Sequence, residues 1–245
     1  MLLLAATAVH AADLRVCAEP DNLPFSHENE SGFENRIARL VADELGMTLR
    51  YSWQPQRRGF VRKTLGTGLC DIWMGVPSDL ERVLPTKPYY RSTYVFVYKH
   101  RPLKSFDDER LRDLRLGIQL PPDGSAATPP GLALALRGAA DKVVGYPLYG
   151  EQPAAQRIVD AVARGELDAG VVWGPAAGFL AARRKLLATP ARAPAELASL
   201  PFEFSISMGV ESGNAGLRDR LNAVIERRQA EIDSILADYS VPLVR

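Results

Sequence analysis

The stretch PYYRSTYVFVYKH, residues 88–100, divides the chain into two parts. Its second half is a run of β-branched and aromatic residues, which is typical of a strand. Arg101 and Pro102 follow, and proline cannot continue a strand in the middle of a sheet. We therefore predict that this strand closes one α/β lobe and passes the chain to a second. Its aromatic start is then expected at a cleft between the lobes.

The residues before this stretch predict three strands separated by two helices. Strands are expected at 14–18, 49–53 and 70–76. Apolar residues recur at helical spacing over 33–45, and Gly46 ends that helix. A shorter helix is expected over 60–65. The β-α-β-α-β order predicts a parallel sheet with right-handed crossovers.

The residues after the stretch predict the same order of elements again. Strands are expected at 116–120, 142–146 and 167–173, and Thr128 followed by Pro129 is a typical helix start. In both halves a glycine ends a helix. An Asp follows at the start of a buried strand, and a proline ends that strand. Residues 188–201 are expected to form a connector, and 202–210 a strand that returns to the first lobe. Two helices are expected at 217–228 and 232–239.

The predicted fold class is therefore α/β, with two doubly wound sheets joined by a two-strand hinge. The first lobe is expected to comprise residues 13–100 and 202–245, and the second lobe residues 101–201. Ligands of open α/β sheets bind outside the carboxyl ends of the strands, so loops from both lobes are expected to converge on one cleft.

Composition excludes some classes of function. The chain has 245 residues, 47% of them hydrophobic and 24% charged, with a formal net charge of +1. These proportions are those of a soluble globular protein. A near-neutral charge argues against general nucleic-acid binding, which needs a basic surface.

Residues 1–12, MLLLAATAVHAA, resemble the end of a secretory signal peptide without its basic first part. The alternative is a short buried N-terminal helix. No other apolar run approaches the ~20 residues of a membrane span. We therefore expect an exported, periplasmic protein with no membrane span.

The two cysteines, Cys17 and Cys70, permit one disulfide in an oxidising compartment. In neighbouring parallel strands they would be offset by about three positions, or ~10 Å. A disulfide needs Cα atoms within ~7 Å. We therefore predict that the two cysteines are not bridged.

Long strings of this sequence resemble a known family. The segments LRVCA at 14–18 and GFE at 32–34 are similar to those of extracellular solute-binding proteins of family 3, the two-lobed periplasmic receptors of ABC importers. A narrower resemblance is to the methanol-oxidation-associated MxaJ/XoxJ subgroup. It rests on CAEPDNLPFS at 17–26, GFEN at 32–35, PQRRGF at 55–60, PYYRSTYVF at 88–96 and VWGP at 172–175.

The resemblance implies a fold, a function and partners. The fold is the type II periplasmic binding protein fold. The subgroup implies a non-enzymatic periplasmic accessory protein that binds a PQQ-dependent methanol or alcohol dehydrogenase, the lanthanide type included, and supports its activation or maturation. The dehydrogenase is then the expected partner, together with its c-type cytochrome, and no cofactor is expected in this chain. The alternative is an importer receptor that binds an unidentified small polar solute.

Amino-acid receptors of this fold need two charged anchors, an arginine in the first lobe for the carboxylate and an acid in the second for the ammonium. The acidic position falls here on Trp173 or Gly174, so the ammonium anchor is missing. Arg82 lies near the expected arginine position, where it either binds a ligand or is a solvated charge. The missing anchor weakens the importer alternative.

The candidate cleft or partner-binding residues share a place at strand ends or in the loops that follow. Arg57 and Arg58 contact an anion or a partner, or are two solvated charges. The tyrosines form a stacking surface or pack at the hinge, and tryptophan is favoured in binding hot spots. The full set is Asn22, Pro24, Phe25, Trp53, Arg57, Arg58, Pro77, Tyr89, Tyr90, Arg91, Thr93, Ser125, Tyr146, Tyr149 and Trp173.

The sequence offers no catalytic constellation. None of His10, His27 and His100 has a partner at metal-ligand spacing, and no G-x-S-x-G nucleophile elbow is present. Gly124-Ser125 before a helix start is suited to binding an anion through backbone N–H groups. We therefore predict that the protein is not an enzyme.

Overall fold

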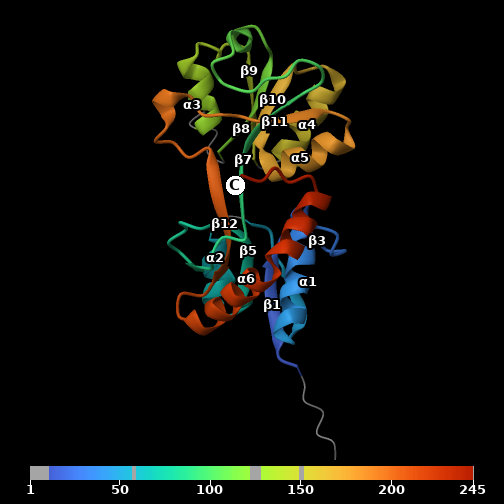
Figure 1. Cartoon of the computed structure of the whole chain (residues 1–245), viewed down its shortest axis with the longest axis vertical. Helices are drawn as coiled ribbons and strands as arrows, with labels where there is room; N and C mark the ends of the chain where they lie inside the picture. The colour runs from blue at the N-terminus through green and yellow to red at the C-terminus, as the bar shows by residue number, and fades with distance from the viewer. Residues whose placement is uncertain (1–10, 57–58, 122–127, 149–151, 245) are drawn as a thin grey trace, which may run out of the picture.

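The computed structural model describes residues 11–56, 59–121, 128–148 and 152–244. Two lobes are stacked along the long axis of the molecule, and two long strands run between them (Figure 1). The signal-peptide prediction falls almost entirely on residues outside these ranges. No helix in the described ranges is long and apolar enough to span a membrane.

The first lobe, the lower one in Figure 1, is built on a parallel sheet in the order β4-β1-β5. A small hairpin, β2 with β3, follows β1. The elements of this lobe in chain order are β1 Asp13–Ala18, β2 Asp21–Asn22, β3 Ser26–His27, α1 Phe33–Leu45, β4 Thr48–Trp53, α2 Phe60–Lys63, a 3-10 turn Leu65–Thr67, β5 Ile72–Pro77 and β6 Leu84–Pro85.

The second lobe repeats this arrangement, with a parallel sheet in the order β9-β8-β10. In each lobe the first strand therefore lies between the second and the third. The elements are a 3-10 turn Glu109–Arg112, β8 Leu116–Leu120, α3 Pro129–Leu136, β9 Val143–Pro147, α4 Ala154–Arg164, β10 Ala169–Trp173, α5 Gly174–Arg183, β11 Leu187–Pro190 and a 3-10 turn Ala195–Leu197.

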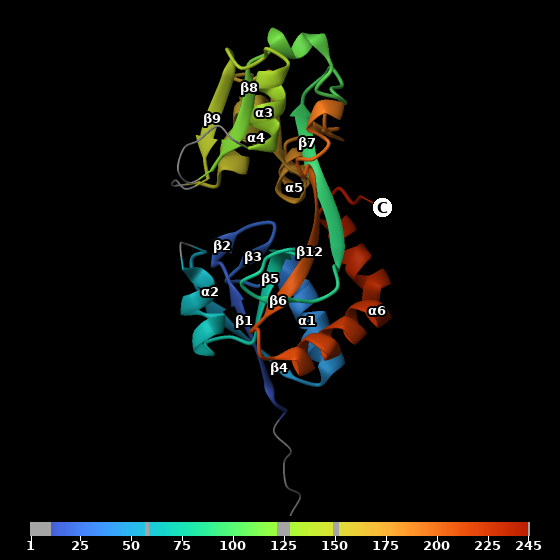
Figure 2. The same ribbon diagram turned by 90° about the vertical axis from the view of Figure 1, so that its left-hand side faces the viewer.

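Strands β7 Tyr90–Tyr98 and β12 Glu203–Val210 join the two lobes as an antiparallel pair. Beyond their shared segment, β12 pairs with β5 of the first lobe and β7 pairs with β10 of the second. The two sheets are thus hydrogen-bonded into one path through the hinge, as Figure 2 shows from the side. This confirms the predicted α/β fold with a two-strand hinge.

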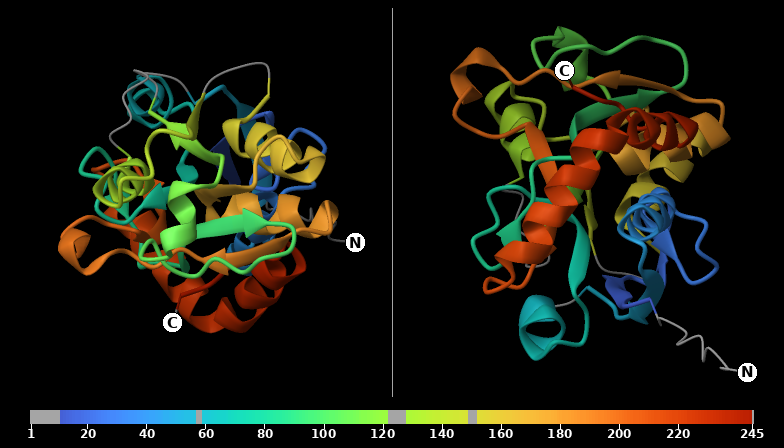
Figure 3. Two further views of the ribbon diagram at one scale, coloured as in Figure 1. Left: turned by 90° about the horizontal axis from the view of Figure 1, so that it is seen from above. Right: turned by 60° about the horizontal axis from the view of Figure 1, so that its bottom comes forward.

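Helices cover both faces of each sheet. In the first lobe, α1 and α6 Ala215–Asp238 pack against one face, while α2 and the turn after it cover the other. In the second lobe, α4 and α5 pack on one face and α3 on the other. Figure 3 shows α6 beside α1, which explains why this C-terminal helix belongs to the core of the first lobe.

An equivalent Arg–Asp ion pair lies at the far end of each sheet. The Arg15 guanidinium and backbone N–H both donate to Asp71, at 2.6–3.1 Å, and Arg15 also donates to a carbonyl at the end of the preceding turn. Arg115 binds Asp168 in the same way, at 2.8–3.2 Å. We call Arg15–Asp71 and Arg115–Asp168 the lobe-end pairs. They show that the repeated Asp seen in the sequence has an arginine partner in both lobes.

The predicted absence of a disulfide is wrong, because Cys17 and Cys70 are bridged with Cα atoms 5.5 Å apart. The prediction placed Cys70 in the third strand, but β5 begins only at Ile72. Because Cys70 lies outside the strand, the expected offset along the sheet does not set its distance from Cys17. Both cysteines are buried in a small cluster under α2.

Two further elements differ from the prediction. The connector at 188–201 contains β11, which pairs with β7 and adds an edge strand to the second sheet. The two C-terminal helices are one helix, α6, with a kink at Arg228. The kink lies close to where the sequence predicted a break.

Candidate functional site

The carboxyl ends of the parallel strands lie on the sides of the lobes that face each other. The hairpin β2–β3, which follows the end of β1, lies at the top of the first lobe, directed at the second lobe (Figure 2). In the second lobe the corresponding ends are those of β8, β9 and β10. We call these two sets of strand ends, with the loops that follow them, the interlobe faces.

Aromatic side chains from both hinge strands meet at the end of β10. Trp173 packs edge-on against Tyr94 of β7 and Phe204 of β12, with ring centroids 5.7 Å and 5.5 Å away. Its backbone N–H donates to Gln119 Oε1 at 3.0 Å. Trp173 is half-buried and also packs against the core of the first lobe. This residue therefore joins the second lobe to the hinge and the first lobe.

Gly174, the next residue, has no room for a side chain. A Cβ atom at this position would lie 2.3 Å from the Thr93 carbonyl oxygen and 2.6 Å from Pro242 Cγ. The C-terminal segment 240–244 packs here, where the Ser92 hydroxyl donates to the Pro242 carbonyl at 2.6 Å and the Val244 N–H to the Arg91 carbonyl at 2.9 Å. The helix α5 thus begins directly against the hinge and the C-terminal segment.

Phe25 contacts the cores of both lobes. It is half-buried, lies 5.3 Å from Phe33 between ring centroids, and packs against the apolar cluster of α4 and α5 as well. Pro24, just before it, is buried and accepts a hydrogen bond from the Phe33 N–H at 2.8 Å. The loop after β2 is therefore an apolar contact between the lobes.

Three of the predicted site residues lie inside the protein and not on the interlobe faces. Tyr89 has no exposed surface, and its hydroxyl accepts a hydrogen bond from the Gly75 N–H at 3.1 Å. Tyr90 packs edge-on against Phe33, and the Thr93 hydroxyl donates to the Phe202 carbonyl at 3.0 Å. The physical reason is that this end of β7 is covered on one side by α1 and α6, so its tyrosines complete the first core.

The other described candidates lie on the surface or part-way to it. Trp53 stacks on Tyr51 at the end of β4, with centroids 4.5 Å apart, and the Arg157 guanidinium lies over the Tyr146 ring at 5.5 Å. Pro77 ends β5, and Asn22 pairs with Ser26 in the hairpin. Arg91 forms an ion pair with Glu203 at 2.8 Å on the hinge. Four candidates, Arg57, Arg58, Ser125 and Tyr149, lie outside the described residues.

Sequence reasoning missed a buried carboxyl group at the start of α1. Glu34 is 6% exposed, and its Oε1 would lie only 2.2 Å from a Cβ added to Gly75, so the carboxyl sits directly against the β5 backbone. Burial, together with the charge of Glu19, raises the pKa of Glu34 to about 8. The sequence did contain a signal for this buried carboxyl. Glu34 is the second residue of a helix whose first residue, Phe33, faces the core.

Nothing in the described part of the chain is arranged to hold a metal ion, because no three His, Cys, Asp or Glu side chains cluster there.

Comparison with known proteins identifies the family. The bacterial extracellular solute-binding proteins, family 3, match residues 14–241. The chain belongs to this family. It is 32% identical to the protein MoxJ of Methylorubrum extorquens strain AM1, over 96% of this chain and 82% of MoxJ.

Solved structures give the same answer. The crystal structure of periplasmic binding protein XoxJ from Methylobacterium extorquens AM1 is 36% identical, covers 95% of this chain and 99% of its own, and superposes with a TM-score of 0.79. MxaJ from Methylophaga aminisulfidivorans MPT, 24% identical over 94% of this chain and 100% of its own, has the same fold with a TM-score of 0.80. The resemblance to the MxaJ/XoxJ subgroup is confirmed.

As a family 3 solute-binding protein, the chain departs from an amino-acid receptor at the acidic anchor position. Trp173 is engaged in aromatic packing where the resemblance implies an acid, and Gly174 has no space for one. Arg82 lies in the loop between β5 and β6, where it lines a surface pocket with Leu80 and Glu211. In the described ranges the pair of charges that would hold a free amino acid is not assembled.

Proposed function

We propose that the protein is a non-enzymatic periplasmic accessory protein that binds a PQQ-dependent methanol or alcohol dehydrogenase, the lanthanide type included, and supports its activation or maturation. The similarity to MoxJ and XoxJ over nearly the whole chain supports the assignment to this group. The observation that carries the proposal is the aromatic group at Trp173, which occupies the position where an amino-acid receptor would bind ammonium.

The interlobe faces supply a surface suited to a protein partner. Half-buried aromatic side chains lie there on both lobes, with Trp53 on the first and Tyr146 on the second. Large aromatic side chains at the centre of an interface contribute much of its binding energy because they bury a large area with few rotatable bonds. We therefore assign the dehydrogenase contact to these faces. Its c-type cytochrome is a second partner of the same system.

A binding measurement with the purified dehydrogenase tests this proposal. The mature protein is titrated into the dehydrogenase, with and without its cofactor, and association is followed by calorimetry and by co-elution. Trp53→Ala and Tyr146→Ala are expected to weaken binding. Leu187→Ala is the control, because Leu187 is 49% exposed on β11, away from the interlobe faces.

Other results would contradict this proposal or favour its alternative. Absence of association with both forms of the enzyme, or full dehydrogenase activity in a strain that lacks the protein, overturns the proposal. A thermal-shift screen against small polar solutes tests the importer alternative, because a ligand at 100 times its Kd adds about 2.7 kcal/mol to the free energy of unfolding. A strong shift with one solute would favour that alternative.

A further inference from the structure

The flank of the first lobe carries an open pocket of about 840 Å³, which shares the loops after β4 and β5 with the interlobe face of that lobe. It lies between α2, the start of β5, the turn before β6 and the turn after β12. Trp73, in its wall, pairs with Gly209 near the end of β12, at the opposite end of β5 from Pro77. The pocket thus extends along β5, from the loops after β4 and β5 to the turn after β12.

The floor of this pocket is apolar and aromatic. Phe60 of α2 packs against Trp73 with ring centroids 4.8 Å apart, and Leu65 and Leu80 extend the same surface. These side chains form the open side of the small cluster that contains the disulfide. The buried indole N–H of Trp73 has no hydrogen-bond acceptor in the described ranges. The floor is therefore a firmly anchored surface that suits the flat body of an apolar ligand.

The rim of the pocket is charged, with an excess of positive charge. Arg62 and Arg82 line it, and no acidic side chain of the described residues lies within ion-pair distance of either guanidinium. Glu211 is the one described carboxylate in the lining, and it likewise has no cationic partner there. Many other arginines of the chain are ion-paired, among them Arg15, Arg115 and Arg228. Two free guanidinium groups against one carboxylate favour an anion.

We propose that this pocket binds a small aromatic carboxylate. Its ring would lie on the surface of Phe60 and Trp73, and its carboxylate would reach the guanidinium of Arg62 or Arg82. The volume falls within the range of about 300–1,000 Å³ typical of small-molecule sites. Guanidinium groups form short, charge-assisted hydrogen bonds to carboxylates, often two at once. This site differs from the proposed dehydrogenase contact in its residues, because neither Trp53 nor Tyr146 lines the pocket.

Binding of cinnamate, an aromatic carboxylate, to the full mature chain tests the proposal by calorimetry and by saturation-transfer NMR. Saturable binding of cinnamate is expected, with weaker binding of its neutral analogue cinnamamide. The double variant Arg62→Gln, Arg82→Gln is expected to weaken cinnamate binding by at least about tenfold, the loss typical of one charge-assisted hydrogen bond. Leu80→Glu, which places a negative charge in the pocket wall, is expected to abolish binding.

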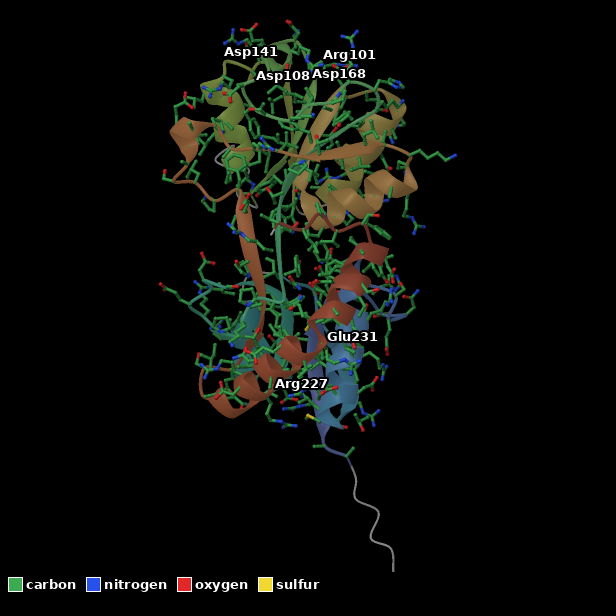
Figure 4. The ribbon with its side chains drawn as sticks, viewed as in Figure 1. Arg101, Asp108, Asp141, Asp168, Arg227 and Glu231 are labelled. Carbon is green, nitrogen blue, oxygen red and sulfur yellow. A yellow bond between two sulfur atoms is a disulfide. The ribbon has the colours of Figure 1, made fainter. Side chains whose placement is uncertain are left out.

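Arg101→Gln is the matched control. Arg101 is another exposed arginine without an acidic partner in the described part of the chain, and it lies at a smaller pocket at the far end of the second lobe (Figure 4). This variant should bind cinnamate as the parent does. Absence of saturable binding overturns the proposal, as does equal affinity for cinnamamide. A loss of affinity in Arg101→Gln that matches or exceeds the loss in the double variant overturns it too. The melting temperature of each variant confirms that it is folded.

Discussion

Glu34 places a carboxyl group among apolar and aromatic side chains, and its charge state is coupled to folding. The folded protein keeps the Glu34 proton up to a pKa of about 8, whereas the unfolded chain releases it near the ordinary value of 4.5. Between these values unfolding releases a proton, so the free energy of unfolding falls as the pH rises. The fall amounts to about 1.4 kcal/mol for each pH unit within the window.

Glu34→Gln is therefore expected to flatten this dependence, because the amide stays neutral at every pH. Urea unfolding at several pH values between about 5 and about 8 measures the slope for parent and variant. Glu28→Gln, at an exposed position, is the control and should keep the parental slope. If Glu34→Gln kept the parental slope as well, the buried Glu34 carboxyl would not cause the pH dependence of the free energy of unfolding.

Gly174 is the second residue whose environment makes a sharp prediction. Gly174→Ala would place a methyl group 2.3 Å from the Thr93 carbonyl oxygen, and the hinge backbone cannot move aside as a side chain can. We expect a loss of about 1–3 kcal/mol in the free energy of unfolding, the usual range for overpacking. Gly213→Ala, where an added Cβ meets nothing within 4 Å, should be close to neutral in the same urea measurement.

Individual residue positions were the hardest feature to predict from the sequence. Tyr89 and Tyr94 occur in one aromatic string, yet Tyr89 has no exposed surface and Tyr94 is half-buried, packed edge-on against Trp173. The difference depends on which helices cover each end of β7. Those helices, α1 and α6, come from opposite ends of the chain, so local sequence patterns do not contain this information.

At the scale of elements, local patterns were sufficient for most helices and strands. The helix at 33–45 begins and ends where the sequence predicts, because its apolar spacing is regular and Gly46 adopts the left-handed conformation that ends it. The strand β11 was missed, since Leu187–Pro190 is short and ends in proline. It forms because the edge of β7 offers hydrogen-bonding groups, which is a tertiary effect.

The disulfide is the element-scale feature with the largest expected effect on stability. Cys17 and Cys70 close a loop with a sequence separation of 53, so the bridge restricts the unfolded chain. Replacing both with serine is expected to reduce the free energy of unfolding by about 2–4 kcal/mol. Urea unfolding with and without a reducing agent measures this. The reducing agent should destabilise the parent only.

Thiol titration of the denatured, unreduced protein provides an independent check. Cys17 and Cys70 are the only cysteines in the sequence, so the bridge predicts that no thiol reacts. Two reactive thiols per chain would contradict the bridge. The sequence did not reveal the bridge because the expected strand register was extended back to Cys70, where the chain has not yet entered the sheet.

At the scale of the whole molecule, the C-terminal segment adds a contact between the lobes to those made by β7, β12, Phe25 and Trp173. Tyr239, next to the end of α6, stacks on Phe179 of α5 with ring centroids 5.7 Å apart, and Gly178 of α5 packs against Ser240. Deleting residues 240–245 is expected to increase the relative motion of the lobes. Hydrogen exchange followed by mass spectrometry should show faster exchange in α5 and at the start of β7.

Ser92→Ala is the matched variant for this deletion. It removes only the 2.6 Å hydrogen bond to the Pro242 carbonyl and leaves the segment in place, so its effect on exchange should be smaller. Unchanged exchange in α5 after the deletion would show that the other contacts alone fix the lobes.

The lobe-end pairs lie away from the loops that would determine what the protein binds. Both lie at the amino ends of the parallel strands, on the outer ends of the two lobes, as the position of Asp168 in Figure 4 illustrates. Each sheet therefore carries an ion pair at its amino end and the loops of an interlobe face at its carboxyl end. Loops that follow β1 and β8 can be exchanged with those of relatives while the ion pairs stay untouched. The same two sheets can thus carry loops that bind a solute or loops that bind a protein.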